Sequence, residues 1–278
     1  MTANAISVVR DGHRTFFKWH RGRRRASDPA FTGRRIVEGM TLGASVEVDL
    51  VIHGGSGFAV LHNLSLEKET TGRGLVRNTP ATMLREMSLR DNSGRPIDER
   101  VMLLEDLAAL IERDGAHPDG LLQLDYKEDA AALTDAAIAS FATALRPVAR
   151  HFILSSGDAE AVRLLSEGVP GLRIGYDPCH MGALERLMKT HDYAGFVAEA
   201  LIAAPDAELQ YIAYPLVLEA ERDGFDIIGA FHAHARRVDA YTVKRADDEG
   251  MAVIERLLAL RVDQITTDDP DGVASRLI

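Results

Sequence analysis

The sequence predicts an α/β fold with a largely parallel sheet, and three observations support it. Short β-branched or apolar runs alternate with longer segments of helical periodicity. Eight strands are expected, alternating with helices, as is typical of a closed (β/α)8 barrel of about 250 residues. No repeat, low-complexity tract or linker divides the chain, so residues 1–278 are expected to form a single domain. A doubly wound open sheet would show the same alternation, and the pattern alone leaves both architectures open.

The expected elements follow one another in regular order. Strands are predicted at 15–20, 45–52, 121–126, 152–155, 172–176, 209–214, 238–243 and 264–267. Helices are predicted around 34–42, 102–113, 130–145, 158–167, 181–203, 219–236 and 247–260. A further strand at 58–62 is joined to 45–52 by Gly54-Gly55-Ser56-Gly57, which predicts a β-hairpin insertion after the second strand. Residues 63–100 are expected to be rich in loops.

Composition is that of an ordinary globular enzyme. Hydrophobic residues make up 46% and charged residues 27% of the 278 residues, enough for a core of normal size. Cys179 is the only cysteine, which excludes a disulfide framework and a cysteine-based zinc site. No segment approaches the roughly 20 apolar residues that span a bilayer, and the first residues lack a signal-peptide pattern. We therefore expect a cytoplasmic enzyme without stable membrane insertion; the sequence leaves the oligomeric state open.

Charge is unevenly distributed along the chain. Residues 1–35 carry nine Lys and Arg against two acidic residues, whereas the remaining 243 residues carry 23 basic and 40 acidic groups. An acidic body argues against nucleic acid as a partner. The arginines at 21 and 23–25 either form a solvated basic loop or attract a phosphate-bearing substrate or an anionic membrane surface.

Acidic residues at the ends of predicted strands suggest a metal site. Glu47 and Asp49 are two apart on one strand and therefore share a face. Two inward carboxylates repel each other unless a cation or a basic residue lies between them. With Asp125 of the next strand they offer three oxygen ligands, which suit Mg²⁺ or Ca²⁺. A structural ion-paired cluster with Lys127 or Arg21 is the alternative.

Two histidines are candidates for proton transfer. His20 and His62 end predicted strands, and the pKa of histidine suits general acid–base catalysis at neutral pH. The other eight histidines are expected to have structural or surface roles: His13, His53, His117, His151, His180, His191, His232 and His234.

Seven short motifs follow in order along residues 15–278. They are HRG at 20–22, GASVEVD at 43–49, VLHN at 60–63, KETTGRG at 68–74, LDYK at 124–127, YTVK at 241–244 and ITTDDPD at 265–271. This series resembles the glycerophosphodiester phosphodiesterase family, whose pattern runs HRG, ExD, HD, RTTxGxG, ExK, WTVN and TDxP. Each motif is weak by itself, whereas seven in order are a strong signal.

The resemblance implies a (β/α)8 (TIM) barrel that hydrolyses a small phosphodiester to an alcohol and a phosphomonoester such as glycerol 3-phosphate. It implies an acid–base pair, three ligands for a divalent cation, and phosphate contacts. These roles fall, respectively, on His20 and His62, on Glu47, Asp49 and Asp125, and on Arg21 and Lys127. Tyr241 and Lys244, at the seventh strand, are expected to contribute to substrate recognition, although barrel packing would equally explain Tyr241.

The chain departs from the family pattern at supporting positions. Ala30 stands where the family has the Glu of PENT, Asn63 where it has Asp, and Lys68 where it has Arg. Asp125 replaces the more frequent Glu, which is also similar to the distantly related sphingomyelinase D enzymes. Groups that support a site tune it by about 10–100-fold. The chain is therefore expected to act on a phosphodiester that differs from the common glycerophosphodiesters.

Two alternatives remain open from the sequence. One is a phospholipase D-like or lyase reaction on a lysophospholipid, in which a substrate hydroxyl attacks phosphorus and a cyclic phosphate is released. The other is a non-catalytic barrel that binds phosphorylated metabolites, which the changes at Ala30 and Asn63 suggest.

Overall fold

A computed structural model of the chain describes residues 2–180 and 182–277. Its barrel strands are β3 (His13–Trp19), β4 (Ser45–Ile52), β8 (Leu121–Tyr126), β9 (Phe152–Ser156), β10 (Arg173–Tyr176), β11 (Leu209–Ala213), β12 (Arg237–Val243) and β13 (Gln264–Thr267). In this described part, the eight strands pair in parallel in the order β3-β13-β12-β11-β10-β9-β8-β4, and β4 pairs again with β3. The ring is therefore closed, which confirms the predicted barrel and rules out the open sheet.

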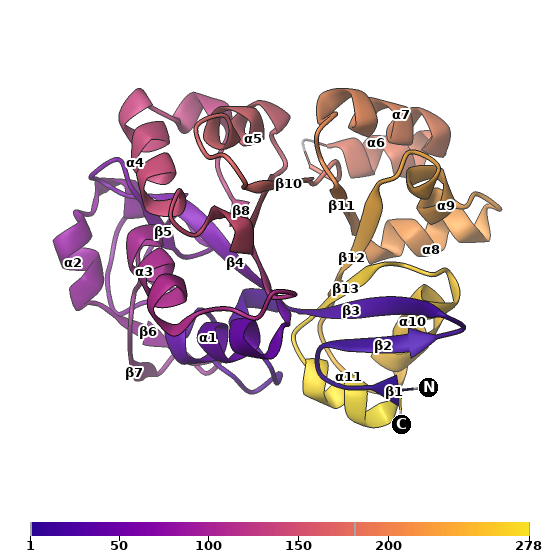
Figure 1. Cartoon of the computed structure of the whole chain (residues 1–278), viewed down its shortest axis with the longest axis horizontal. Helices are drawn as coiled ribbons and strands as arrows, with labels where there is room; N and C mark the ends of the chain where they lie inside the picture. The colour runs from indigo at the N-terminus through magenta and orange to yellow at the C-terminus, as the bar shows by residue number, and fades with distance from the viewer. Residues whose placement is uncertain (1, 181, 278) are drawn as a thin grey trace.

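Helices surround the barrel, as Figure 1 shows. They are α1 (Gly33–Leu42), α3 (Leu104–Asp114), α4 (Asp135–Leu145), α5 (Ala159–Ser166), α6 (Ala183–Thr190), α7 (Tyr193–Ala203), α8 (Tyr214–Arg222), α9 (Ile227–His232), α10 (Asp248–Ala259) and α11 (Pro270–Arg276). Short 3-10 turns are η1 (His20–Gly22), η2 (Val76–Asn78), η3 (Ala130–Ala132) and η4 (Ala149–His151). In the described part of the chain, no helix is both long and apolar enough to cross a bilayer.

The barrel strands are buried on both faces, with different residues on each. All eight residues of β4 are buried. Its apolar residues, such as Val46 and Val48, belong to the large core cluster shared with the surrounding helices, whereas Glu47 and Asp49 alternate with them and face the interior. Leu121, Ile153, Leu209 and Tyr211 form a small apolar cluster inside the barrel, separate from the large core cluster under the helices.

The insertion after the second barrel strand is present as predicted. β5 (Phe58–Val60) pairs antiparallel with β4, with Ile52 opposite Phe58. The stretch expected to be loop-rich also contains α2 (Ala81–Glu86), and a small antiparallel sheet of β6 (Ser88–Arg90) and β7 (Pro96–Arg100). This segment provides one wall beside the barrel opening.

An antiparallel extension at the amino end was not predicted. β1 (Thr2–Ala3) pairs with β2 (Ser7–Arg10), and β2 pairs with β3 (Figure 1). Asp11 and Gly12 form the β2–β3 turn with φ of 49° and 76°, the positive values that a two-residue hairpin turn requires. The Asp-Gly pair is a strong hairpin signal and could have revealed this element from the sequence.

Two helices predicted as continuous are each divided in two. The one expected at 181–203 breaks between α6 and α7, where His191 has φ of 53° and Asp192 caps α7 by accepting from Gly195 N–H; residue 181 lies outside the described residues. The one expected at 219–236 breaks between α8 and α9, where Gly224 has φ of 82° and Asp226 caps α9. Apolar periodicity continued through both breaks, so the capping aspartates were the missed signal.

Candidate active site

The carboxyl ends of the barrel strands surround a cavity of about 290 Å³. It is lined by Lys18, His20, Arg21, Glu47, His62, Gln123, Asp125, Lys127, Asp177, His180, Tyr211, Tyr241, Thr242, Lys244 and Thr266. Eight of the nine residues predicted for the site are among them, and the ninth, Asp49, lies in the carboxylate cluster beside the cavity. Because parallel strands end at one face of a barrel, residues separated by more than 200 positions meet here.

Three carboxylates form the acidic mouth of the barrel: Glu47, Asp49 and Asp125. One oxygen from each lies within 4.8 Å of the others. The cluster arises from register, since Asp49 on β4 is directly opposite Asp125 on β8. Burial, and then the charge of Asp49, raise the pKa of Glu47 well above its usual value. The cluster therefore holds more negative charge than its surroundings readily accommodate.

Two cations pair with Asp49. Lys127 Nζ lies 2.8 Å from Asp49 Oδ1, and Arg21 Nε lies 3.1 Å from Oδ2. Burial acts to raise the pKa of Asp49, but Lys127 and Arg21 outweigh it and lower the pKa to about 2. Lys127 also contacts Asp125. The ion pairs with Lys127 and Arg21 that the sequence analysis gave as the alternative to a metal site are therefore present.

The acidic mouth nevertheless fits a divalent cation. Asp49 is buried and is held by its ion pairs with Lys127 and Arg21. Glu47 accepts one hydrogen bond, from Arg21 N–H at 2.7 Å. Three converging carboxylates with unused acceptor capacity are the donor set that a hard cation such as Mg²⁺ or Ca²⁺ prefers.

His20 is held by a carboxylate behind it. Its Nδ1 lies 2.7 Å from Asp268 Oδ1. A carboxylate can only accept, so Nδ1 donates, and Nε2 is left on the side of Glu47, 3.9 Å from its Oε2. Burial lowers the pKa of His20, although the hydrogen bond to Asp268 acts to raise it. Asp268 belongs to the motif at 265–271, yet its role as partner of His20 was not predicted.

The backbone turn after His20 places its neighbours. Arg21 has φ of 55°, a left-handed conformation that residues with a side chain rarely adopt. The turn directs Arg21 N–H to Glu47 and its guanidinium to Asp49. Gly22 follows with φ of 69°, and a methyl group there would lie 2.9 Å from Ile36. The HRG sequence is therefore needed for the backbone path as well as for its side chains.

His62 is positioned through its backbone. Glu69 Oε2 accepts hydrogen bonds from His62 N–H at 3.1 Å and Asn63 N–H at 3.0 Å. Burial lowers the pKa of the His62 imidazole, although the charge of Asp49 acts to raise it. Glu69 lies in the motif at 68–74, but its sequence position gave no indication that it anchors His62.

A third histidine lies in the cavity. His180 Nε2 is 2.9 Å from Asp177 Oδ2, and the hydrogen bond to Asp177 raises the pKa of His180. The sequence analysis gave His180 a structural or surface role, and its place at the cavity differs from that expectation. Asp177 directly follows β10 and therefore belongs to the catalytic face, which is the signal that could have drawn attention to both residues.

A second polar layer, the lysine floor, lies beneath the acidic mouth and comprises Lys18, Gln123, Asp239 and Thr266. Lys18 is 2% exposed, and its Nζ lies 3.1 Å from Asp239 and 4.2 Å from the centre of the Tyr211 ring. Lys18 also donates to Gln123 Oε1. Thr266 donates to Asp239 at 2.6 Å. The charge of Lys18 is thus matched within the barrel.

Hydrogen bonds connect the lysine floor to the acidic mouth. Gln123 Nε2 donates to Ser155 Oγ at 2.8 Å, and Ser155 donates to Asp125 Oδ1 at 2.8 Å. Because Lys18 can only donate, it fixes the orientation of the Gln123 amide and thereby that of the Ser155 hydroxyl. None of these supporting residues was predicted, although a lysine within a buried strand is an unusual feature of the sequence.

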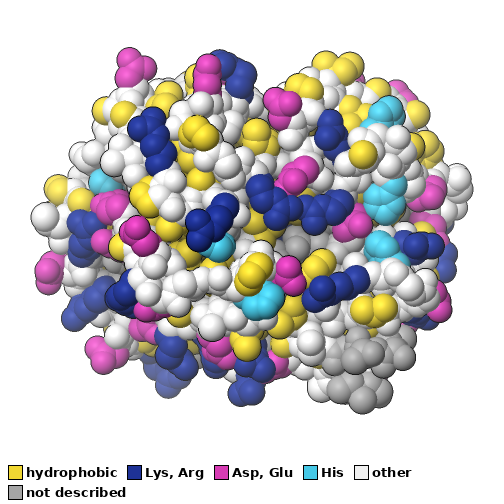
Figure 2. All heavy atoms as spheres, in the orientation of Figure 1, with side chains coloured by type: hydrophobic (Ala, Val, Ile, Leu, Met, Phe, Trp, Pro, Cys, Tyr) yellow, Lys and Arg dark blue, Asp and Glu magenta, His cyan; other side chains and the backbone are white. Residues whose placement is uncertain are grey.

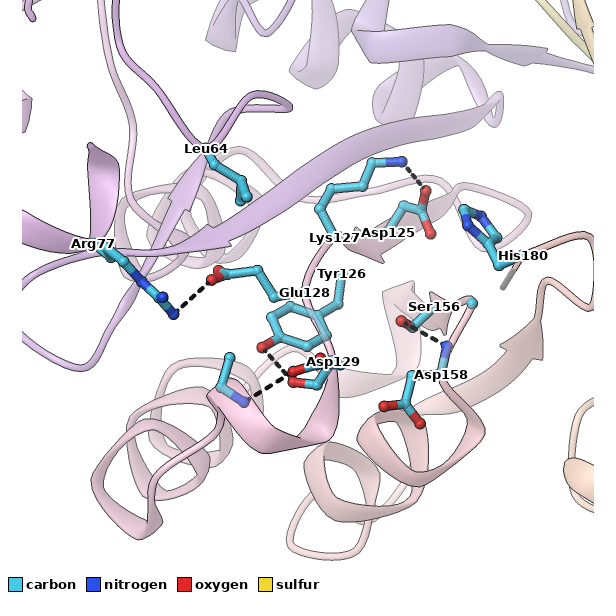
Figure 3. A pocket seen from close by; sticks show the side chains of 12 residues that line it. Leu64, Arg77, Asp125, Tyr126, Lys127, Glu128, Asp129, Ser156, Asp158 and His180 are labelled. Carbon is cyan, nitrogen blue, oxygen red and sulfur yellow. Dashed lines mark hydrogen bonds and ion pairs between the residues drawn. The ribbon is translucent and has the colours of Figure 1, made fainter. Parts of the chain in front are cut away.

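A second cavity of about 390 Å³ adjoins the first. The two cavities share Asp125, Lys127 and His180. Figure 3 shows these side chains along one wall, with Glu128, Asp129 and Asp158 on the opposite side. Each of those three acids accepts a backbone N–H, from Ile52, Ala132 and Ala130 respectively. They are therefore partly used in holding the loops at this end of the barrel.

The basic residues near the amino end are largely neutralised. Arg24 pairs with Glu38 at 2.6 Å and Asp271 at 2.9 Å, and Arg23 pairs with Asp268 at 3.0 Å. Arg25 also pairs with Asp271. These arginines are accordingly ion-paired rather than a free basic loop. Over the whole face in view in Figure 2, acidic and histidine side chains are interspersed among the Lys and Arg.

Comparisons with known proteins agree with this geometry. The model of the glycerophosphoryl diester phosphodiesterase family matches residues 39–272. A comparison with curated proteins gives no match. A putative glycerophosphoryl diester phosphodiesterase from Silicibacter pomeroyi is 19% identical, with a TM-score of 0.71 over 96% of this chain and 92% of that one. A putative glycerophosphodiester phosphodiesterase from Galdieria sulphuraria is 18% identical, with a TM-score of 0.70 over 95% and 97%.

A third structure contains a ligand. A phosphodiesterase from Oleispira antarctica, in complex with its product sn-glycerol-3-phosphate, is 19% identical, with a TM-score of 0.65 over 94% of this chain and 96% of that one. At these identities the structures establish the barrel fold. The family match covers most of the sequence, and the chain therefore belongs to the glycerophosphoryl diester phosphodiesterase family, a family of phosphoric diester hydrolases.

Proposed function

We propose that this chain, working as one barrel unit, uses a divalent cation to hydrolyse a glycerophosphodiester-like substrate to an alcohol and a phosphomonoester such as glycerol 3-phosphate. The observation that supports this most is the meeting of His20, His62, Glu47 and Asp125 at one cavity, with Asp49 completing the carboxylate cluster. The Oleispira antarctica enzyme, which shares the barrel and binds glycerol 3-phosphate, supports the choice of product.

His20 and His62 are proposed to carry the protons. One imidazole accepts a proton from water as its oxygen bonds to phosphorus, and the other donates a proton to the alcohol oxygen as the phosphorus–oxygen bond breaks. Burial lowers the pKa of both side chains, which favours the neutral form that can accept a proton. Asp268 fixes the tautomer of His20 so that Nε2 faces the cavity.

The remaining site residues are proposed to stabilise charge. Glu47, Asp49 and Asp125 would hold the cation, Mg²⁺ or Ca²⁺, which when bound would withdraw charge from the phosphoryl oxygens. Arg21 and Lys127 line the cavity and would contact the phosphate. Tyr241 and Lys244 lie at the cavity on β12 and just beyond it, and are proposed to contact the leaving alcohol.

The test is hydrolysis with and without chelation. The wild-type protein should hydrolyse bis(p-nitrophenyl) phosphate or glycerophosphodiesters, lose that activity in EDTA, and recover it when Mg²⁺ or Ca²⁺ is added in excess. Full activity in excess chelator would contradict the cation assignment.

Phosphorus NMR of the products separates hydrolysis from the lyase alternative, because only the lyase releases a cyclic phosphate. Membership of a hydrolase family argues against the non-catalytic alternative.

A further inference from the structure

A third cavity, of about 340 Å³, shares Arg21 with the catalytic cavity. Its lining residues come from the loop after β3 and from the insertion between β5 and α3: Arg21, Arg23, Ala30, Phe31, Lys68, Glu69, Leu89, Arg90, Asp91, Asn92 and Gly94. The proposed reaction does not use this space apart from Arg21. Glu69 connects it to the site, because the same carboxylate holds the backbone of His62.

Positive charge predominates in this cavity. Four of its lining residues are basic and two are acidic. Both acids are already occupied: Glu69 accepts two N–H groups of the His62 loop. Asp91 accepts from Ser93 N–H, from Arg95 N–H and from the Arg95 side chain. Of the four cations, Arg21 pairs with Asp49 and Arg23 with Asp268, which leaves Lys68 and Arg90.

Arg90 and Lys68 carry the uncompensated charge. In the described part of the chain, neither has a carboxylate within 4.0 Å. Arg90 Nε donates to Thr70 O at 2.6 Å, and its Nη1 donates to Gly94 O at 2.7 Å. Because both acceptors are neutral carbonyls, they fix the guanidinium plane without cancelling its charge. A rigidly held arginine without an acidic partner is pre-organised for an anion.

The apolar lining leaves room for a ligand. Ala30 contributes only a methyl group, and the buried Phe31 lies beneath Arg21, with its ring centre 5.9 Å from the guanidinium carbon. Ala30 and Lys68 are two of the departures from the family pattern, and both line this one cavity. The short side chain of Ala30 and the unpaired cation of Lys68 therefore line the same cavity.

We propose that this cavity is a subsite for a second anionic group, a carboxylate or a phosphate, carried by the phosphodiester substrate. This inference rests on the proposed function, since Arg21 would contact the reacting phosphate on one side and border the subsite on the other. Lys68 and Arg90 bind the second group. The preferred substrate accordingly has two negatively charged groups, unlike a diester of two neutral alcohols.

Binding of product-like probes tests the subsite without requiring turnover. Glycerol 1,3-bisphosphate and glycerol 3-phosphate are titrated by calorimetry into the wild-type protein supplied with Mg²⁺. The bisphosphate should bind about 10–100-fold more tightly, as expected for one or two added charge-assisted hydrogen bonds. Lys68→Gln and Arg90→Gln should each remove most of this preference. Ala30→Glu, which places a carboxylate in the cavity, should remove it as well.

Arg73→Gln is the matched control, because Arg73 is an exposed cation of the same loop that does not line the cavity. It should keep the wild-type preference. Equal binding of the two probes by wild type, or a preference that survives in a Lys68→Gln/Arg90→Gln double variant, would overturn the proposal. Lys68→Arg should retain the preference, which separates loss of charge from damage to the loop.

Turnover distinguishes a substrate subsite from a site for a free anion. Wild type should show a higher kcat/KM for bis(glycero)phosphate carrying one terminal phosphate than for bis(glycero)phosphate itself, and Lys68→Gln should reduce this ratio. A preference seen in binding but not in turnover indicates a free-anion site and contradicts the proposal. Lys68-dependent binding without hydrolysis of any diester would contradict the proposed reaction and support the subsite.

Discussion

The acidic mouth and the lysine floor are both buried polar clusters of one barrel, yet their charges are arranged differently. In the floor, Lys18 is matched by Asp239, and Thr266 and Gln123 supply hydrogen bonds. In the mouth, Glu47, Asp49 and Asp125 crowd together, and burial and the charge of Asp49 raise the pKa of Glu47.

The difference separates two uses of buried charge. In a cluster whose positive and negative charges are matched, the attraction between them offsets the cost of removing them from water, and the pairing specifies one arrangement of the interior. A mismatched cluster is stable only because the surrounding fold imposes it, and such strain gathers at functional sites. We therefore expect changes in the mouth to affect chemistry and changes in the floor to affect stability.

The largest expected effect is on catalysis by the two histidines beside the acidic mouth. His20→Ala and His62→Ala should each lower kcat by about 10²–10⁴-fold, because each removes a proton-transfer group. The melting temperature should stay close to that of wild type. Steady-state hydrolysis of bis(p-nitrophenyl) phosphate and calorimetry measure the two quantities. His234→Ala, at an exposed position, is the control and should be fully active; retained activity in either site variant would remove that histidine from the mechanism.

The floor should show the opposite behaviour. Lys18→Met leaves Asp239, whose side chain is 0% exposed, without its cation, and should lower the free energy of unfolding by about 3–5 kcal/mol. Adding Asp239→Leu should recover much of the loss, since an apolar pair can replace a buried ion pair. Chemical denaturation measures both. Arg163→Met, which breaks an exposed ion pair with Glu160, should change little. A stable but inactive Lys18→Met variant would place Lys18 in the catalytic machinery instead.

Asp268→Asn tests the coupling of His20 to its carboxylate. The hydrogen bond to Asp268 raises the pKa of His20 against the lowering effect of burial, so the variant should have a still lower His20 pKa. The limb of the pH–rate profile that belongs to His20 should move to lower pH, and kcat should fall by about 10–100-fold. NMR titration and the rate profile measure this. Asp271→Asn, which affects only pairs with Arg24 and Arg25, should leave the profile in place.

The smallest expected effect comes from breaking the hydrogen bonds that connect the lysine floor to the acidic mouth. Ser155→Ala removes the hydroxyl that donates to Asp125 Oδ1 and should weaken binding of Mn²⁺, used as a probe cation, by roughly tenfold. Titration calorimetry of the metal-free protein measures this without reference to activity. Ser156→Ala is the neighbouring control, since Ser156 Oγ accepts from Asp158 N–H instead. Equal Mn²⁺ affinity in the Ser155 variant would show that the floor does not orient the mouth.

Much of the barrel was predictable because local pattern and fold agree. The strands at 45–52, 121–126 and 264–267 were predicted with the bounds that the structure shows, since each is a short apolar run. The helices around 181–203 and 219–236 were predicted too long, because apolar spacing continued across breaks made by Asp192, Gly224 and Asp226. The β2–β3 hairpin was missed although Asp11-Gly12 marked it.

The sequence by itself determined the order of motifs, and with it the family, the barrel and the set of candidate residues, because each motif is a short local pattern. Only the tertiary structure decided which residues support them. Asp268 reaches His20 across 248 positions, Glu69 holds the His62 backbone, and Lys18 reaches Asp125 through Gln123 and Ser155. Asp268 and His20, and the residues from Lys18 to Asp125, come from separate strands that become neighbours only when the barrel closes. Glu69 is only seven positions from His62, but the fold of the insertion decides that its carboxylate turns back to the His62 backbone.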